Sequence, residues 1–166
     1  MAFSLRPTAI ALGSNQGDRE AQLLYAVAQI RVFLNDVIVS IPIETKPEGV
    51  SGASQGCFLN AAAVGWSNES PDTLLEKLQL IENDCGRVRP FPGAPRTLDL
   101  DLILVGDLVI HMPGLILPHP RFRERRFVLE PLASIAPHLV DPVTTCTIRE
   151  LLVKLKQGEE TVVNPL

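Results

Sequence analysis

Polar and apolar residues alternate strictly from Thr97 to Leu102, in the run Thr-Leu-Asp-Leu-Asp-Leu. A period of two predicts a half-buried β-strand whose successive side chains point to opposite faces of a sheet. Asp99 and Asp101 therefore share one face, about 7 Å apart along the strand. Two neighbouring carboxylates repel one another and disfavour a strand. The pair therefore either meets water and arginines on a solvated face or binds a divalent cation such as Mg²⁺, which prefers oxygen ligands.

The rest of the chain alternates between short apolar runs and segments with helical spacing. Apolar runs predict further strands at residues 8–12, 37–43 and 58–66. Gly106-Asp107 is a short hairpin signal, which predicts that the central strand turns back into residues 108–110. Apolar residues at helical spacing, or helix start signals, predict helices at residues 18–35, 70–86, near 125–135 and from 147 onward.

Several of these helices carry recognisable end signals. Asp18 and Ser70 are N-cap residues, Gly86 is a stop signal, and Thr147 opens a Thr-Ile-Arg-Glu capping box. The resulting β-α-β-β-α-β order predicts an α+β fold with a ferredoxin-like βαββαβ core, in which a mainly antiparallel sheet has helices on both sides. Neither a Gly-x-Gly-x-x-Gly fingerprint nor a Walker motif occurs, which argues against a Rossmann dinucleotide site.

Composition favours one domain spanning residues 1–166, because 46% of the residues are hydrophobic and no linker divides the chain. The first apolar run is interrupted by Arg6 and Pro7 and is too short for a signal peptide or a membrane span. Three widely spaced cysteines without a Cys-x-x-Cys pair favour a reduced, cytoplasmic protein. The three histidines do not cluster, so no zinc site is predicted.

Charge is distributed unevenly along the chain. Residues 87–126 hold seven arginines, no lysines and only four acidic residues, although the whole chain carries a net charge of −4. Guanidinium groups bind phosphate bidentately and stay charged. An arginine cluster around a carboxylate pair therefore favours a polyphosphate and metal site, the alternative being a set of weak surface salt bridges. His119, set between two prolines near four of these arginines, is either a phosphate contact or a turn histidine.

Two further segments have open interpretations. Residues 44–56 contain three glycines and a proline without any period, which is typical either of a binding loop or of a surface insertion. Asn60 interrupts the apolar run 58–66, and a polar amide there needs hydrogen-bond partners. It either fixes backbone or recognises the edge of a flat heterocycle, with the ring of Phe58 stacked on its face.

Taken together, these motifs carry a resemblance. The sequence is similar, in order, to 6-hydroxymethyl-7,8-dihydropterin pyrophosphokinase at Ala-Leu-Gly-Ser-Asn (11–15), Phe-Leu-Asn-Ala-Ala (58–62), Gly-Arg-Val-Arg (86–89), Pro-Arg-Thr-Leu-Asp-Leu-Asp-Leu (95–102), Leu-Pro-His (117–119) and Arg-Arg-Phe (125–127). The match covers about residues 8–140, and its Pro-Arg-Thr-Leu-Asp-Leu-Asp segment is highly specific. It implies a cytosolic folate-synthesis enzyme that transfers the pyrophosphoryl group of ATP to the pterin hydroxymethyl oxygen and releases AMP.

The resemblance also implies roles for individual residues. Asp99 and Asp101 are implied to hold two Mg²⁺ ions, with Arg87 and Arg96 beside them as catalytic residues. The remaining implied contacts divide between the two substrates. For the pterin they are Thr45, Phe58, Asn60 and Phe127, and for ATP they are Gln79, Glu82, Arg87, Arg89, Arg96, His119 and Arg125. Glu82 has the alternative role of orienting Arg87.

Two departures from the family pattern concern closure over ATP. The segment from Arg89 to Arg96 is one residue shorter than in well-known bacterial members and has Gly93 where they carry tryptophan. Gly114 stands where many members place arginine. Because closure over the nucleotide then forms fewer favourable interactions, we expect weaker ATP binding than in members with both residues.

Two other functional classes stay open at this point. A two-metal phosphohydrolase needs the same carboxylates and arginines. A noncatalytic nucleotide- or RNA-binding module is disfavoured by 5% aromatic content and the acidic net charge. The expected partners are therefore small molecules, without nucleic acid or membrane, and the protein is expected to be a monomer or a weak homo-oligomer.

Overall fold

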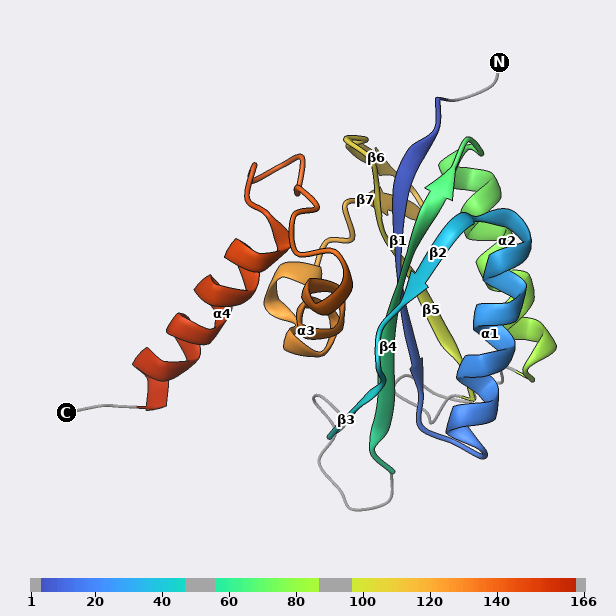
Figure 1. Ribbon diagram of the computed structural model, residues 1–166, viewed down its shortest axis with the longest axis horizontal. Coiled ribbons are helices and arrows are strands. Elements are labelled where there is room, and N and C mark those ends of the chain that lie inside the picture. Colours follow the sequence, from blue (N-terminus) through green and yellow to red (C-terminus); the bar gives the residue numbers. More distant parts are fainter. Residues whose placement is uncertain (1–3, 47–55, 87–96, 164–166) are drawn as a thin grey trace.

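The computed structural model describes residues 4–46, 56–86 and 97–163, with side chains described up to residue 159 (Figure 1). The strands of the described chain are β1 (Arg6–Ser14), β2 (Asn35–Val39), β3 (Ile43–Thr45), β4 (Phe58–Ser67), β5 (Asp99–Val105), β6 (Ile110–Met112) and β7 (Leu115–Leu117). The helices are α1 (Arg19–Phe33), α2 (Pro71–Asp84), α3 (Arg126–Ile135) and α4 (Ile148–Val163), with a 3₁₀ turn at Phe122–Glu124.

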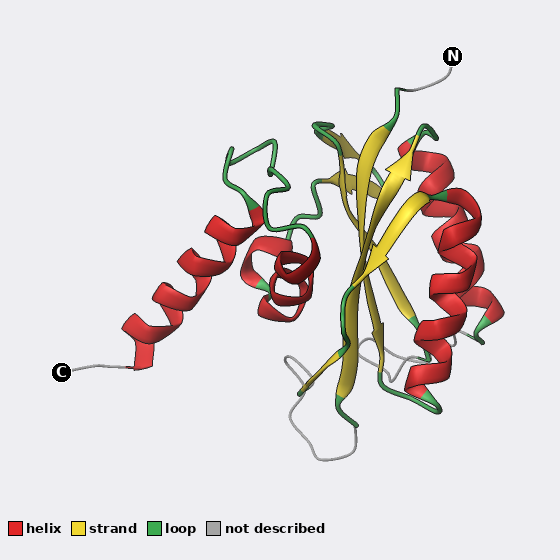
Figure 2. Ribbon diagram, viewed as in Figure 1, coloured by secondary structure: helices red, strands yellow, loops and turns green. Residues whose placement is uncertain are grey.

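One antiparallel sheet organises these elements. Its strand order is β2-β4-β1-β5, and β3 also pairs with β4. Helices α1 and α2 cover one face, whereas α3 lies against the other face and α4 stands outside α3 (Figures 1 and 2). The predicted α+β fold with a ferredoxin-like βαββαβ core and helices on both sides is confirmed.

Two apolar clusters hold the layers together, one on each face. The cluster under α1 and α2 includes Leu12, Leu78 and Leu100. The cluster under α3 includes Ala62, Ile103 and Leu129. Alternate residues of the same strands supply the two clusters, as the period of a β-strand requires.

The predicted helix ends are confirmed. Asp18 accepts a hydrogen bond from the Ala21 N–H at 3.0 Å, and the Ser70 hydroxyl accepts one from Thr73 at 3.2 Å. Gly86 follows α2 with a φ of +73°, the left-handed conformation that suits glycine after a helix. No helix within the described residues has the length and apolar character needed to cross a membrane.

Two strand predictions were wrong in detail. The run 37–43 forms two short strands, β2 and β3, on either side of residues 40–42, and both pair with β4. The turn at Gly106-Asp107 exists, but residues 108–110 do not pair with β5. Instead β6 pairs with β7 around Pro113-Gly114 in a separate two-stranded sheet. Gly114 has a φ of +83° there, which only glycine adopts easily.

Strand β5 lies at an edge of the sheet, and its backbone is bound by one side chain and one backbone N–H from other segments. The buried Glu82 carboxylate of α2 accepts a hydrogen bond from the Leu100 N–H at 3.0 Å. Further along, the Ile103 carbonyl accepts the His119 N–H at 2.9 Å. These bonds tie α2 and the segment after β7 to the strand that carries the aspartates.

Candidate active site

A row of polar and small residues crosses the sheet on the face that α3 partly covers. Asn60 of β4 lies opposite Gly13 of β1, which lies opposite Asp99 of β5. Directly paired residues point to the same face, as do residues two apart in one strand, so Asp101 joins this row. Both carboxylates are half-buried. The prediction that Asp99 and Asp101 share one face is therefore confirmed.

The Asn60 amide is fixed by a neighbouring strand. Its Nδ2 donates to Thr45 Oγ1 at 2.5 Å, and Asn60 is only 5% exposed. An amide has two N–H donors and a carbonyl acceptor, so one bond to Thr45 leaves capacity for a ligand. The half-buried ring of Phe58 lies two residues away on the same face. Thr45, Phe58 and Asn60 are thus brought together.

Gly13 forms the floor beside this group, a role that sequence reasoning missed. A Cβ at residue 13 would lie 3.1 Å from Asn60 Oδ1 and 3.6 Å from Phe58 Cδ1. Even alanine would therefore crowd the amide. The Gly-Ser-Asn motif marked a turn, but only the strand pairing shows that its glycine faces Asn60.

Phe127 and Arg125 stand at the start of α3. The Arg125 guanidinium carbon lies 5.6 Å from the centroid of the Phe127 ring, a cation–π distance. Phe127 is half-buried and packs against the cluster under α3. Since α3 contacts both β4 and β3, these two residues lie on the same side of the sheet as Asn60.

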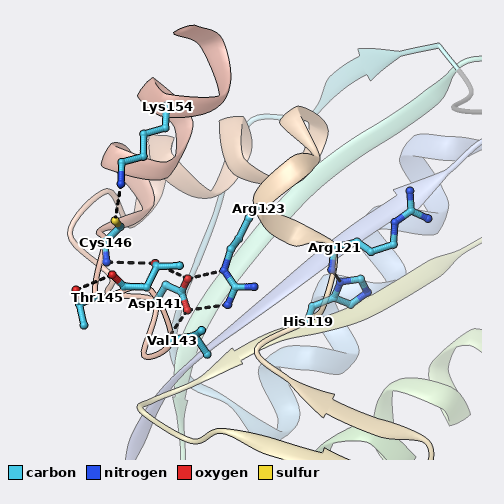
Figure 3. A network of polar contacts seen from close by, with 9 residues as sticks. His119, Arg121, Arg123, Asp141, Val143, Thr145, Cys146 and Lys154 are labelled. Carbon is cyan, nitrogen blue, oxygen red and sulfur yellow. Dashed lines mark hydrogen bonds and ion pairs between the residues drawn. The ribbon is translucent and has the colours of Figure 1, made fainter. Parts of the chain in front are cut away.

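His119 is half-buried between positive groups. Burial lowers its pKa, as do the charges of Arg125 and Arg121, whereas Asp99 acts to raise it. The Arg121 N–H donates to His119 Nδ1 at 3.2 Å (Figure 3). Because Nδ1 accepts this hydrogen bond, the ring proton lies on Nε2, and the lowered pKa favours the neutral form of the imidazole. That arrangement makes His119 a hydrogen-bond donor beside a carboxylate and two arginines.

A pocket of about 280 Å³ opens at the edge of β5. Leu75, Leu102, Leu115 and Ile116 supply apolar walls, while Asp101 and His119 supply the polar groups. Apolar walls with a few converging polar groups are typical of small-molecule sites. Gly114 also lines this pocket, and a Cβ there would meet nothing within 4 Å.

The other predicted site residues fall into two sets. Gln79 is exposed on α2, whereas Glu82 is 2% exposed and binds the backbone of β5, so its carboxylate has a structural role whatever else it contacts. Arg87, Arg89 and Arg96 lie outside the described residues, as does Gly93. Their predicted roles stay predictions.

A partly buried ion pair that sequence reasoning missed anchors the segment bearing His119 and Arg125. Asp141, whose side chain is fully buried, accepts from Arg123 Nε at 2.6 Å and from the second guanidinium nitrogen at 3.0 Å (Figure 3). Burial alone would raise the pKa of Asp141, but hydrogen bonds from Arg123, Thr144 and the Val143 N–H lower it overall. The two partners are 18 residues apart.

The carboxylate pair fits a hard, oxygen-preferring cation. Within the described ranges, no group of three or more His, Cys, Asp or Glu side chains is arranged to hold a metal ion. A carboxylate pair suits Mg²⁺, which keeps several waters and shares its remaining positions with substrate phosphates. The donor set on β5 is thus compatible with the predicted ions.

Comparisons with known proteins agree with this arrangement. The family model described as 7,8-dihydro-6-hydroxymethylpterin-pyrophosphokinase (HPPK) matches residues 9–137. The 2-amino-4-hydroxy-6-hydroxymethyldihydropteridine pyrophosphokinase of Bacillus subtilis is 44% identical over 138 residues, which cover 82% of this chain and 81% of that protein.

Longer proteins contain a similar region. The folic acid synthesis protein fol1 of Pneumocystis carinii is 39% identical over 147 residues, 88% of this chain but only 20% of that protein. The crystal structure of wild-type Plasmodium falciparum HPPK-DHPS superimposes with a TM-score of 0.72 at 15% identity, over 95% of this chain and 46% of that chain. That structural likeness concerns the fold, whereas the family match and the Bacillus relative show that the chain belongs to the 7,8-dihydro-6-hydroxymethylpterin-pyrophosphokinase family.

Proposed function

We propose that this protein transfers the pyrophosphoryl group of ATP to the hydroxymethyl oxygen of 6-hydroxymethyl-7,8-dihydropterin, releasing AMP, as a step of folate synthesis. The observation that carries this proposal is the row Asn60, Gly13 and Asp99 across three adjacent strands. In this row an amide suited to the edge of a heterocycle and a carboxylate suited to a cation share one face of the sheet. A pterin bound at Asn60 is therefore close to phosphates bound near Asp99.

The pterin occupies the end of the row at β3 and β4. Asn60 forms hydrogen bonds with the edge of the heterocycle, and Thr45 fixes the orientation of the amide. The rings of Phe58 and Phe127 contact the two faces of the heterocycle. Flat rings stack favourably on aromatic side chains, and a buried amide imposes directional hydrogen bonds. Gly13 supplies the space beside the amide.

ATP occupies the opposite end, at the edge of β5. The apolar walls of the pocket, Leu75, Leu102 and Ile116, receive the adenosine part. His119 and Arg125 then contact the phosphates, with Arg87, Arg89, Arg96 and the helix residues Gln79 and Glu82 completing the predicted ATP contacts. A neutral His119 with its proton on Nε2 donates a hydrogen bond to a phosphate oxygen.

Asp99 and Asp101 would hold two Mg²⁺ ions, which when bound offset the charge of the triphosphate. The protein's own residues position the two substrates so that the hydroxymethyl oxygen faces the β-phosphorus in line with the bond that breaks. Arg87 and Arg96 join them as positive groups near the developing charge. Positioning and electrostatic stabilisation account for most of the rate enhancement in phosphoryl transfer.

Residues 1–166 act as one catalytic domain in this proposal, in the cytoplasm, as a monomer or weak homo-oligomer. The cysteines Cys57, Cys85 and Cys146 are all free thiols, which fits a reducing compartment.

One coupled assay tests the proposal. The full chain is incubated with ATP, Mg²⁺ and the reduced pterin, and AMP and pterin pyrophosphate are quantified together. We expect equal amounts of the two products, and no AMP when pterin is omitted. Phosphate release without pterin would instead identify a phosphohydrolase, and omission of Mg²⁺ tests the metal requirement.

A further inference from the structure

Arg19, in the first turn of α1, connects three elements at the pterin end of the site. Its guanidinium donates to the carbonyl oxygen of Cys57 at 2.9 Å and also to the carboxylate of Glu44. Cys57 immediately precedes β4, and Glu44 is the middle residue of β3. One side chain thus holds the start of β4 and a residue of β3 against the helix.

The position of Arg19 is unfavourable for the helix itself. A positive charge in the first turn opposes the helix macrodipole, where acidic residues are preferred. The two contacts offset this cost, and arginine suits them because its planar fork donates in two directions at once. A lysine offers a compact charge that cannot reproduce the same fork.

Each residue that Arg19 contacts is next to a predicted pterin contact. Glu44 precedes Thr45, and Cys57 precedes Phe58. Because strand residues alternate between faces, Glu44 points toward α1 while Thr45 points toward the site, where its hydroxyl accepts from Asn60.

Strand β3 needs such support because it is short. It has three residues and, within the described residues, pairs with β4 alone. A short edge strand is held by few ladder hydrogen bonds, so a side-chain contact from outside the ladder contributes a large share of its order.

We propose that Arg19 is a positioning residue that fixes β3 and the start of β4 before the pterin binds. With both strands fixed, Thr45 orients the Asn60 amide, and the Phe58 ring already has the position in which it contacts the pterin. This inference rests on the proposed function, since it concerns the pterin end of that site. Preorganisation of this kind lowers the ordering cost of binding.

The expected signature is a selective loss of pterin affinity. Arg19→Met keeps the length and apolar stem of the side chain but removes both contacts. We expect about a tenfold weaker pterin Kd and a similarly raised KM for pterin, with kcat at saturating pterin within about twofold. ATP-analogue affinity should not change, because the pocket at β5 lies at the other end of the sheet row.

Three further variants sharpen the experiment. Arg19→Lys keeps the charge beside Glu44 but loses the fork, and should recover part of the pterin affinity. Glu44→Gln weakens one of the two contacts from the other partner and should give a smaller loss than Arg19→Met. Arg31→Met is the matched control on the same helix, where Arg31 donates to the Val37 carbonyl at 3.0 Å, and it should leave pterin affinity unchanged.

Calorimetry with the reduced pterin and, separately, with a nonhydrolysable ATP analogue gives the affinities. A wild type that binds no pterin would overturn the proposed function and this inference with it. A wild type that binds pterin while Arg19→Met binds equally well would overturn only the role of Arg19. Parallel losses of pterin and ATP-analogue affinity with a lowered Tm would likewise overturn it, because they indicate a general structural role.

Discussion

The two faces of the sheet differ in the side chains that they present to the helices covering them. Under α1 and α2 the centre of the face is apolar, and β5 contributes Leu100 and Leu102, each at most 5% exposed. On the α3 face the apolar cluster gives way to the polar row that ends at Asp99. Alternate residues of β5 therefore belong to the apolar core and to the polar row, although Leu100 and Leu102 also line the pocket at the edge of the strand. Substitutions on the two faces should therefore differ in how much unfolding free energy they cost.

The largest expected effect comes from the carboxylates on the α3 face. Asp99→Asn or Asp101→Asn should lower kcat/KM by about a hundredfold or more, comparable to removing a main electrostatic stabiliser, while metal-free pterin binding is largely kept. Steady-state kinetics at moderate Mg²⁺ and calorimetry with pterin measure the two quantities. Near-normal turnover in both variants would contradict the metal assignment.

The matched control is the neighbouring residue on the opposite face. Leu100→Ala removes buried apolar volume under α2 and should cost about 3 kcal/mol of unfolding free energy. Denaturant unfolding should show this loss in Leu100→Ala and only a small change in Asp99→Asn. If both variants lost stability equally, the division between the two faces would be wrong.

A substitution at Asp141 tests how much its ion pair with Arg123 contributes to stability on the α3 side of the sheet. Asp141→Asn removes a fully buried charge that accepts two hydrogen bonds from Arg123, and we expect a loss of about 3 kcal/mol of unfolding free energy. A fall in Tm without any change in catalysis of the folded fraction would limit the ion pair to stability. A catalytic defect in the folded fraction would show that it also positions His119 and Arg125.

The same carboxylate predicts a pH dependence. Because the pKa of Asp141 is lowered in the folded state, the unfolded chain binds more protons at acidic pH. The contribution of Asp141 is complete above the ordinary carboxyl pKa of about 4 and is lost as the pH falls through the lowered value. Unfolding free energies measured between neutral pH and strongly acidic pH should fall less steeply in Asp141→Asn than in the wild type.

A smaller effect is expected at the pterin end of the row. Asn60→Ala should weaken pterin binding by roughly 1 to 3 kcal/mol, because bound pterin groups lose their partner. Since the amide also donates to Thr45, calorimetry must be paired with an unfolding measurement. Unchanged pterin affinity with a much less stable fold would favour a purely structural amide. Gly13→Ala, which crowds Asn60 Oδ1, should weaken pterin binding in the same direction.

The smallest effect is expected at the ATP pocket. Gly114→Arg adds the cation that the resemblance led us to expect at this position, but a φ of +83° makes any side chain costly, by about 1 kcal/mol. Gly114→Ala bears the same backbone strain without the charge and is the proper reference. We expect Gly114→Arg to bind an ATP analogue about threefold more tightly than Gly114→Ala. Equal affinities would contradict the expected arginine contact.

Local patterns could predict the elements but not all of their partners. The alternation at residues 97–102 and the caps at Asp18 and Ser70 depend on neighbours in sequence, so they could be predicted correctly. The hairpin at Gly106-Asp107 was misplaced because Pro113-Gly114 carries equally good turn chemistry, and tertiary packing decides which strands pair.

In the site, too, features set by local sequence could be predicted and features set by strand pairing could not. The shared face of Asp99 and Asp101 follows from the strand period, whereas the approach of Gly13 to Asn60 depends on the pairing register of β1 and β4. Likewise the contact between Arg123 and Asp141 joins segments 18 residues apart, and no local pattern encodes it. Contacts of this kind are set by packing and could not be predicted from the sequence.

The binding of the β5 backbone by Glu82 and His119 has a consequence for solubility. An edge strand whose N–H and C=O groups stay unpaired is a template for strands of other molecules, and so for aggregation. Here the Leu100 N–H is taken by Glu82 and the Ile103 carbonyl by the His119 N–H, so an incoming strand finds parts of this edge already paired. The open pocket beside β5 can thus admit a small molecule while the strand itself resists association with another chain.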